Sequence, residues 1–238
     1  KLNRRYYHHG LKVVEVARDL EIPWSFAFLP EGGLLVAERP GRLRIVDAQG
    51  RAGPPLAGLP PVAAVGEGGL LGVALAPDFP RSRQLYWSYS EADPGGGPGY
   101  GTAVARGVLR DGRLENVQVI FRQGSGATDL RHFGGRLLFD AQGRLLVGLG
   151  DRMLRADAQA PGSLHGKIVR LMPDGQVPPD NPWVGRTDAA PAVWSLGHRN
   201  VHGLAWHPTT GSLWASEHGP SGGDEINRIA PGRNYGWP

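Results

Sequence analysis

Three glycine-rich segments of the chain carry side chains that could act in acid–base, anion-binding or metal-binding chemistry. In the first, His132 lies just before Gly134 and Gly135, at the start of an apolar run. The pKa of a histidine imidazole lies near working pH, so His132 could act as a general base. The chain has eight histidines, however, and a single histidine is more often a structural residue. Both interpretations of His132 stay open on residue type alone.

The second segment covers residues 195–200 and also directly precedes an apolar run. Its last two residues, Arg199 and Asn200, offer guanidinium and amide donors, which suit a planar ligand rich in oxygen. The alternative is a turn in which the same two side chains cap backbone groups. The residues alone do not separate these two possibilities.

The third segment, residues 217–225, is dense in carboxylates and glycines. Hard cations such as calcium bind oxygen ligands, including backbone carbonyls, in loops of this kind. The segment lacks the alternating aspartates of an EF-hand loop. It is therefore compatible with a calcium site of a different type.

A repeated sequence pattern predicts the strands that position these segments. Each repeat contains a short apolar strand, a turn, and a second strand that begins with a small or basic residue and leucine. The four copies are 24–30 with 33–38, 71–77 with 84–89, 135–140 with 144–148, and 202–208 with 212–216. Third strands are expected at 42–47, 103–109, 167–172 and 225–229.

Short strands in groups of three or four, repeated at blade-sized intervals, predict an all-β fold of the β-propeller type with about four blades. A β-sandwich would not repeat one pattern at this spacing. In a propeller, the loops that precede the innermost strands line the central channel. His132 and the segment 195–200 would therefore face a common channel.

Composition agrees with this fold and excludes several classes of protein. Glycine (37) and proline (21) make up about a quarter of the 238 residues, as expected for a chain with many turns. The chain has no cysteine, so disulfides and thiolate sites are excluded. The net charge is +4, but the basic residues are scattered, and no nucleic-acid partner is expected. No apolar run approaches the ~20 residues of a membrane span.

The extent of the chain leads to two expectations. The last copy of the repeat runs to Pro238 with no returning strand, so residues 1–238 are interpreted as one propeller domain that is incomplete at its C-terminus. An open propeller exposes strand edges, and the isolated polypeptide is expected to be unstable or to aggregate. The polar segment 1–10 is interpreted as a mature terminus without a leader.

An ordered set of motifs extends from about residue 12 to the end of the chain. The set resembles the soluble aldose sugar dehydrogenases that depend on pyrroloquinoline quinone (PQQ), often called glucose/sorbosone dehydrogenases. The motifs are Ile22-Pro-Trp-Ser-Phe-Ala-Phe-Leu-Pro, Gly66-Glu-Gly-Gly-Leu-Leu-Gly, His132-Phe-Gly-Gly-Arg-Leu, Gly148-Leu-Gly-Asp, Gly166-Lys-Ile-Val-Arg-Leu, Asp180-Asn-Pro, Gly197-His-Arg-Asn, Glu217-His-Gly-Pro-Ser-Gly-Gly-Asp-Glu-Ile-Asn and Asn234-Tyr-Gly-Trp-Pro.

This resemblance implies a six-bladed propeller that oxidises the C1 hydroxyl of aldose sugars to lactones. Hydride would pass to calcium-bound PQQ. By the same resemblance His132 is the general base beside the cofactor, and Asp151 orients or tunes its imidazole. Arg199 and Asn200 contact the quinone oxygens, and Arg199 stabilises the negative charge that develops there.

The resemblance also assigns the glycine-rich loop and the C-terminal motif. The backbone carbonyls of Gly219 and Pro220 would hold calcium, and Asp224 would act on the ion through water. His218 and Tyr235 would lie against the cofactor. An external electron acceptor and a periplasmic or secreted location are implied as well, whereas the oligomeric state is not.

The sequence departs from the family at three points. Val201 and His202 stand where Pro-Gln is frequent, and Glu67 stands beside the substrate where glutamine is common. Basic residues that would grip the carboxylates of PQQ have no counterpart before Pro238. Propellers host many functions, so two others are kept as alternatives: a metal-dependent sugar-lactone hydrolase and a non-catalytic propeller that binds carbohydrate or protein.

Overall fold

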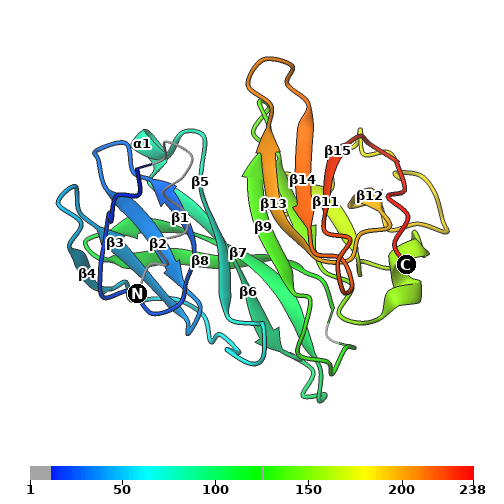
Figure 1. The fold of residues 1–238 in the computed structure, drawn as a ribbon, viewed down its shortest axis with the longest axis horizontal. Helices are drawn as coiled ribbons and strands as arrows, with labels where there is room; N and C mark the ends of the chain where they lie inside the picture. Colours follow the sequence, from blue (N-terminus) through cyan, green and yellow to red (C-terminus); the bar gives the residue numbers. More distant parts are fainter. Residues whose placement is uncertain (1–11, 125) are drawn as a thin grey trace.

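The computed structural model describes residues 12–124 and 126–238. The strands in these residues form four antiparallel sheets (Figure 1). The segment 1–10, interpreted above as a mature terminus, lies outside the described residues. Within each sheet, strands that follow one another in the chain are neighbours, as consecutive hairpins require. The first sheet contains β1 Pro23–Phe28, β2 Leu34–Glu38, β3 Arg42–Val46 and β4 Ala52–Pro55; the second, β5 Leu70–Leu75, β6 Gln84–Ala92, β7 Tyr100–Arg110 and β8 Arg113–Arg122; the third, β9 Gly134–Phe139, β10 Leu145–Leu149, β11 Lys167–Leu171 and β12 Val193–Leu196; the fourth, β13 Val201–Trp206, β14 Leu213–Glu217 and β15 Glu225–Ile229.

The sheets are successive blades of a β-propeller, as the sequence repeat predicts. The first strands of the blades contact one another in chain order: β1 contacts β5, β5 contacts β9, and β9 contacts β13. In Figure 1 the blue, cyan, green and orange strands follow one another in the same order. The expected first, second and third strands all coincide with observed strands to within a few residues. The prediction of an all-β propeller with about four blades is confirmed.

The outermost strands are the part of the fold that the repeat does not predict individually. Strand β4 ends in two prolines, which a sheet tolerates only at an edge, because proline has no amide to donate. Strand β8 alternates exposed and part-buried side chains and therefore lacks the apolar run of an inner strand. Both strands pair with the third strand of their blade and close its outer side.

The inner strands of the third blade are buried on both faces because this blade packs between the second and fourth blades. In β10, Leu145, Val147 and Leu149 belong to the core cluster between the second and third blades. Leu146 belongs to the cluster between the third and fourth blades. The period of two in a strand thus sends alternate side chains into different cores. Each fully buried leucine or valine contributes roughly 1.5–3 kcal/mol of hydrophobic free energy.

The hairpin between β9 and β10 shows how the predicted turns form. The carboxylate of Asp140 accepts hydrogen bonds from the amides of Gln142 and Arg144 at 2.9 and 2.8 Å. Gly143 has φ 77°, a left-handed conformation that glycine adopts without strain. The turn therefore fixes the register of the two strands that carry His132 and Asp151 at their far ends.

Close approach between blades explains Gly72 in β5 and Gly135 at the start of β9. A side chain at Gly72 would place its Cβ 2.1 Å from the carbonyl oxygen of Gly135 on the next blade. Ser88 joins the two glycines: its hydroxyl accepts from the amide of Gly72 at 2.8 Å and donates to the carbonyl of Gly135. The second and third blades are thus held together just beside His132.

Helical structure in the described residues is limited to α1 Phe79–Ser82 and the 3₁₀ helix η2 Arg155–Gln159. Neither of these helices has the length and the apolar composition that spanning a membrane requires.

Candidate active site

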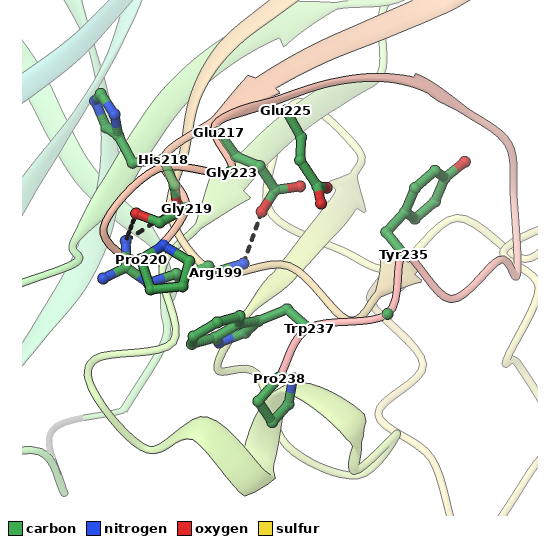
Figure 2. A pocket seen from close by; sticks show the side chains of 11 residues that line it. Arg199, Glu217, His218, Gly219, Pro220, Gly223, Glu225, Tyr235, Trp237 and Pro238 are labelled. Carbon is green, nitrogen blue, oxygen red and sulfur yellow. Dashed lines mark hydrogen bonds between the residues drawn. The ribbon is translucent and has the colours of Figure 1, made fainter.

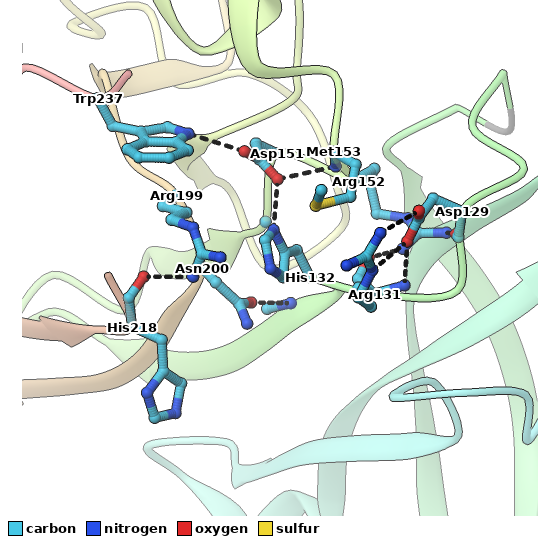
Figure 3. Close-up of polar contacts among 12 residues, drawn as sticks. Asp129, Arg131, His132, Asp151, Arg152, Met153, Arg199, Asn200, His218 and Trp237 are labelled. Carbon is cyan, nitrogen blue, oxygen red and sulfur yellow. Dashed lines mark hydrogen bonds and ion pairs between the residues drawn. The ribbon is translucent and has the colours of Figure 1, made fainter. Parts of the chain in front are cut away.

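A buried histidine–carboxylate pair stands at the centre of the candidate site. The Nδ1 atom of His132 lies 2.7 Å from Oδ1 of Asp151, and both side chains are almost completely buried (Figure 3). His132 comes from the loop before β9, and Asp151 follows the end of β10, which pairs with β9. The hairpin therefore brings together two residues that lie 19 positions apart.

The surroundings of Asp151 fix which nitrogen of His132 carries a proton. Burial by itself would raise the pKa of the Asp151 carboxyl, but hydrogen bonds from His132, the Met153 amide and the Trp237 indole hold it below its ordinary value. The two oxygens accept from Met153 at 2.8 Å and from Trp237 at 2.7 Å. An ionised carboxylate can only accept, so Nδ1 of His132 must donate to it. Nε2 then keeps its lone pair and can accept a proton.

The backbone of His132 is held in a left-handed conformation with φ 57°, which is uncommon for a residue other than glycine. Its amide donates to Oε2 of Glu67 at 2.8 Å. The amide of Glu67 in turn donates to the carbonyl of Leu130 at 2.8 Å. Glu67, expected beside the substrate, is thus bonded directly to the loop of the candidate base.

Arg199 and Asn200 lie on the neighbouring blade, in the loop before β13. The amide of Arg199 donates to Oε2 of Glu217 at 2.7 Å (Figure 2). Its guanidinium donates through Nη1 to the carbonyls of His218 and Gly219 at 3.0 and 2.9 Å. The carboxamide oxygen of Asn200 accepts from the amide of Gly134 at 3.0 Å, so Asn200 bridges the third and fourth blades.

The loop after β14 contains the predicted calcium ligands. Its fold depends on Asp224, whose carboxylate accepts from the amide of Gly219 at 2.9 Å. This bond, helped by His218, lowers the pKa of Asp224. Pro220 lines the same cavity as Gly219. The Gly219 carbonyl already accepts from Arg199, so an ion at this carbonyl would share it with a guanidinium or displace the guanidinium.

Two residues of the C-terminal motif lie against the site in different ways. The Tyr235 ring lines a cavity, but its hydroxyl donates to the carbonyl of Arg228 at 2.8 Å and accepts from the amide of Ala230 at 2.7 Å. Both hydrogen bonds of the hydroxyl therefore go to the backbone at the end of β15 and in the turn that follows it. Trp237 has no role in the sequence analysis, although the terminal motif contains it. Its indole binds Asp151 and lies 5.2 Å from the Arg199 guanidinium.

A second histidine–carboxylate pair, His198 and Glu217, fixes the backbone of Arg199 through the bond from its amide to Glu217. Nδ1 of His198 lies 2.8 Å from Oε1 of Glu217, and Nε2 lies 2.8 Å from the hydroxyl of Ser195. Glu217 also accepts from Arg199 and Asn227, and together with His198 these bonds hold its pKa low against the effect of burial. His198 and Ser195 are completely buried, so this chain of hydrogen bonds is structural.

Two cavities meet at Arg199, His218 and Gly219. The larger, of about 550 Å³, is also lined by Glu67, His132 and other residues of the first, third and fourth blades. The smaller, of about 230 Å³, is also lined by Glu217 and by residues of the C-terminal motif (Figure 2). The structure thus brings together the predicted residues Glu67, His132, Arg199, Asn200, His218 and Gly219 in one cavity, and Pro220 and Tyr235 in the adjoining one. Asp224 lines neither of them.

Trp24 and His202 also line the larger cavity, and the sequence does not predict their contacts. His202 packs against the ring of Trp24 at 5.5 Å and against His218 at 4.8 Å. Arg136 lies over Trp24 at 4.8 Å and donates to the carbonyl of His202 at 2.7 Å. Burial, reinforced by His218 and Arg136, lowers the pKa of His202 to about 4. His202 is therefore neutral at physiological pH.

The candidate metal ligands are backbone atoms. Residues 12–124 and 126–238 contain no group of three or more His, Asp or Glu side chains that could hold a metal ion. A cation at this site would be held by the carbonyls of the loop after β14 and by oxygen atoms of a bound cofactor. Such oxygen atoms suit a hard cation such as calcium.

Comparisons with known proteins agree on one family. The sequence profile of the family described as Glucose / Sorbosone dehydrogenase matches residues 20–238. The chain is 46% identical over 229 residues to the aldose sugar dehydrogenase YliI of Escherichia coli, covering 94% of this chain and 61% of that protein. A crystal structure of a glucose dehydrogenase superposes with a TM-score of 0.91 at 52% identity, covering 96% of this chain and 66% of the other.

A further relative is a PQQ-bound aldose sugar dehydrogenase from Streptomyces coelicolor. It is 38% identical, with a TM-score of 0.84 over 95% of this chain and 66% of the other. The chain therefore spans somewhat less than two thirds of the length of these relatives.

Proposed function

Since the chain belongs to the glucose/sorbosone dehydrogenase family, we propose that it is part of a PQQ-dependent enzyme that oxidises the C1 hydroxyl of aldose sugars to lactones. The observation that carries this proposal is the short bond between His132 and Asp151, with His132 lining a cavity shared with Glu67, Arg199 and Asn200. We also propose an external electron acceptor and, from the family resemblance, a periplasmic or secreted location.

The donors around Arg199 suit an anionic, oxygen-rich cofactor such as PQQ. The Nε atom of Arg199 is buried and has no hydrogen-bond partner among the described residues. Such a group costs about 1–3 kcal/mol until a ligand satisfies it. The carboxamide oxygen of Asn200 is occupied by Gly134, which leaves the amide NH₂ as the part of this side chain that can bind a ligand. When bound, PQQ would supply the two-electron acceptor for hydride.

His132 would remove the proton in this reaction. Asp151 holds Nδ1–H, so the lone pair of Nε2 can take the proton of the C1 hydroxyl while the C1 hydride leaves. The positive charge that forms on the imidazole is stabilised by the buried carboxylate. Arg199 would stabilise the negative charge that develops on the acceptor. The sugar loses one proton and one hydride, which balances its conversion to a lactone.

Calcium would be held by the carbonyls of Gly219 and Pro220, with Asp224 fixing the loop through the Gly219 amide. The donor set fits a hard cation, with one condition. Arg199 must share or release the Gly219 carbonyl, because its guanidinium donates to that oxygen at 2.9 Å.

The two alternatives are less well supported. A lactone hydrolase of the kind considered above needs several carboxylate or amide side chains around one metal ion. The described residues contain no cluster of three or more His, Asp or Glu side chains. A purely binding propeller gives no reason for a buried Nδ1-to-carboxylate bond on a histidine that lines the cavity.

Dye-coupled oxidation of aldoses after incubation with calcium and PQQ tests the proposed function. We expect turnover that requires both additions and that disappears in His132→Gln. Lactone hydrolysis that needs a metal but no quinone would replace this proposal with the hydrolase. Sugar binding that His132→Gln leaves intact, with no turnover in either protein, would replace it with the binding propeller.

A further inference from the structure

Arg152 follows Asp151 in the chain, and its side chain is completely buried. No assignment from the family resemblance includes it. Its guanidinium lies 3.5 Å from the centre of the Phe133 ring. A buried cation in this place needs partners, because the low dielectric of a protein interior disfavours an unpaired charge. Burial indeed lowers the pKa of Arg152 to about 10.

Two of the three carbonyls that Arg152 binds belong to the loop that carries His132 (Figure 3), and the third is the carbonyl of Tyr100 on β7, to which Nη2 donates at 3.4 Å. The Nη1 atom donates to the carbonyl of Arg131, and Nη2 donates to the carbonyl of Asp129 at 2.5 Å. With Phe133 beneath the guanidinium, the side chain contacts the residues immediately before and after His132.

The hydrogen bonds from Arg152 hold the backbone on the N-terminal side of His132, which has an unusual conformation. His132 has φ 57°, a conformation that is strained for a residue with a Cβ and that persists only if its surroundings hold it. Two bonds hold this stretch from the side of the second blade: His132 donates to Glu67, and Glu67 donates to the carbonyl of Leu130. Arg152 holds it from the side of β10.

We propose that Arg152 is a positioning residue for the candidate base: its guanidinium grips the carbonyls of residues 129 and 131, so that one backbone segment, Asp151–Arg152, fixes both the imidazole and the loop that bears it. This inference deepens the proposed function and rests on it. The rigid two-pronged geometry of the guanidinium is required, because a lysine ammonium is a single point charge at the end of a flexible chain.

The two histidine–carboxylate pairs supply the test. A proton in a short imidazole–carboxylate bond gives an NMR resonance downfield of the amide region, so the His132–Asp151 and His198–Glu217 pairs report independently. The resonance that Asp151→Asn removes belongs to His132. These spectra need neither PQQ nor sugar, so what they show about Arg152 holds even if the proposed activity is absent.

We expect Arg152→Met and Arg152→Lys to shift or abolish the His132 resonance and to leave the His198 resonance in place. In the cofactor-loaded protein, kcat should fall by about 10- to 100-fold, as a misplaced catalytic group predicts. Lys167→Met is the matched control. Lys167 is also completely buried, and it donates to the carbonyls of Asp157, Ala158 and His165, away from the base.

An unchanged His132 resonance in both Arg152 variants would overturn the proposal. An equal shift of that resonance in Lys167→Met would overturn it as well, because the effect would then come from general loss of stability. If Arg152→Met loses both resonances through unfolding, Arg152→Lys decides. In that milder variant the proposal requires that only the His132 resonance changes.

Discussion

His132 and His198 hold comparable places in neighbouring blades, and each binds through Nδ1 a carboxylate 19 residues further along the chain. In both blades the imidazole precedes the first strand, and the carboxylate lies at the end of the second strand or just after it. The two pairs are therefore versions of one arrangement at the same corner of the third and fourth blades.

The two pairs differ in the surroundings of the imidazole that they contain. Nε2 of His198 is bonded to Ser195, and its ring stacks on Tyr235 at 4.9 Å. His132 instead lines the larger cavity. One pair can therefore exchange a proton with a ligand, whereas the other holds Glu217 and, through it, the backbone of Arg199. This division of roles leads to the first two predictions.

Replacing His132 with glutamine should remove the base and keep the fold. We expect kcat for aldose oxidation to fall by about 10²- to 10⁴-fold, the usual contribution of a general base. Glutamine can still donate to Asp151, so the thermal unfolding midpoint should change little. Steady-state assays with PQQ and calcium measure the first quantity, and circular dichroism measures the second. A kcat within a few-fold of the parent value would show that another group takes the proton.

Replacing His198 with phenylalanine should have the opposite outcome for stability. The ring volume is preserved, but Glu217 and Ser195 lose a buried partner. We expect the free energy of unfolding to fall by about 2–4 kcal/mol, because breaking a buried pair leaves an uncompensated charge. Urea denaturation followed by tryptophan fluorescence measures this. Equal stability of the variant and the parent would mean that the pair is not a structural support.

His202 predicts a pH dependence of stability. Its folded-state pKa is about 4, below the ordinary value of 6.5, chiefly because of burial and then because of His218 and Arg136; Glu67 acts in the opposite sense. Between these pH values the unfolded chain binds more protons at this residue, so stability should fall as pH falls from 6.5 to 4. His202→Gln should lose less stability across that window in urea titrations at both pH values. Parallel losses in the two proteins would assign the effect to other groups.

Sequence patterns predict the inner strands well because burial on both faces leaves a continuous apolar run, as in β10. They also mark His132, Arg199 and Asn200, since each lies in a glycine-rich loop before a first strand. The outer strands are less visible because their burial pattern is weak, and the prolines of β4 argue against a strand unless its edge position is known.

The contacts that complete the site could not be predicted in the same way. Trp237 reaches Asp151 across 86 residues, and only the tertiary fold brings them together. Arg152 binds backbone carbonyls, and every residue has one, so no residue type at a given spacing reveals the partner. The departure at His202 is visible in the sequence, but its contacts with Trp24 and Arg136 depend on packing between the first, third and fourth blades.

Trp237→Phe isolates the indole hydrogen bond to Asp151. The ring is largely preserved, while Oδ2 of the carboxylate loses the donor at 2.7 Å. The pKa of Asp151 should rise toward its ordinary value, since this bond helps to hold it down. We expect kcat/KM to fall by roughly fivefold, equivalent to about 1 kcal/mol for one hydrogen bond. Unchanged kcat/KM would show that the bond from Met153 and the His132 pair are sufficient to hold the carboxylate.

Arg199→Lys tests whether the guanidinium, and not only its charge, binds the quinone. Lysine keeps the positive charge but loses the planar donors, including the buried Nε that has no partner among the described residues. We expect the Kd for PQQ to rise at least about tenfold, in line with the loss of a charge-assisted hydrogen bond of about 1.5–3 kcal/mol. Quenching of tryptophan fluorescence measures this Kd, because Trp237 lies 5.2 Å from the guanidinium.

The same variant should bind calcium at least as tightly as the parent, because the guanidinium that donates to the Gly219 carbonyl is then absent. Weaker binding of both ligands would instead mean that Arg199 mainly shapes the loop after β14.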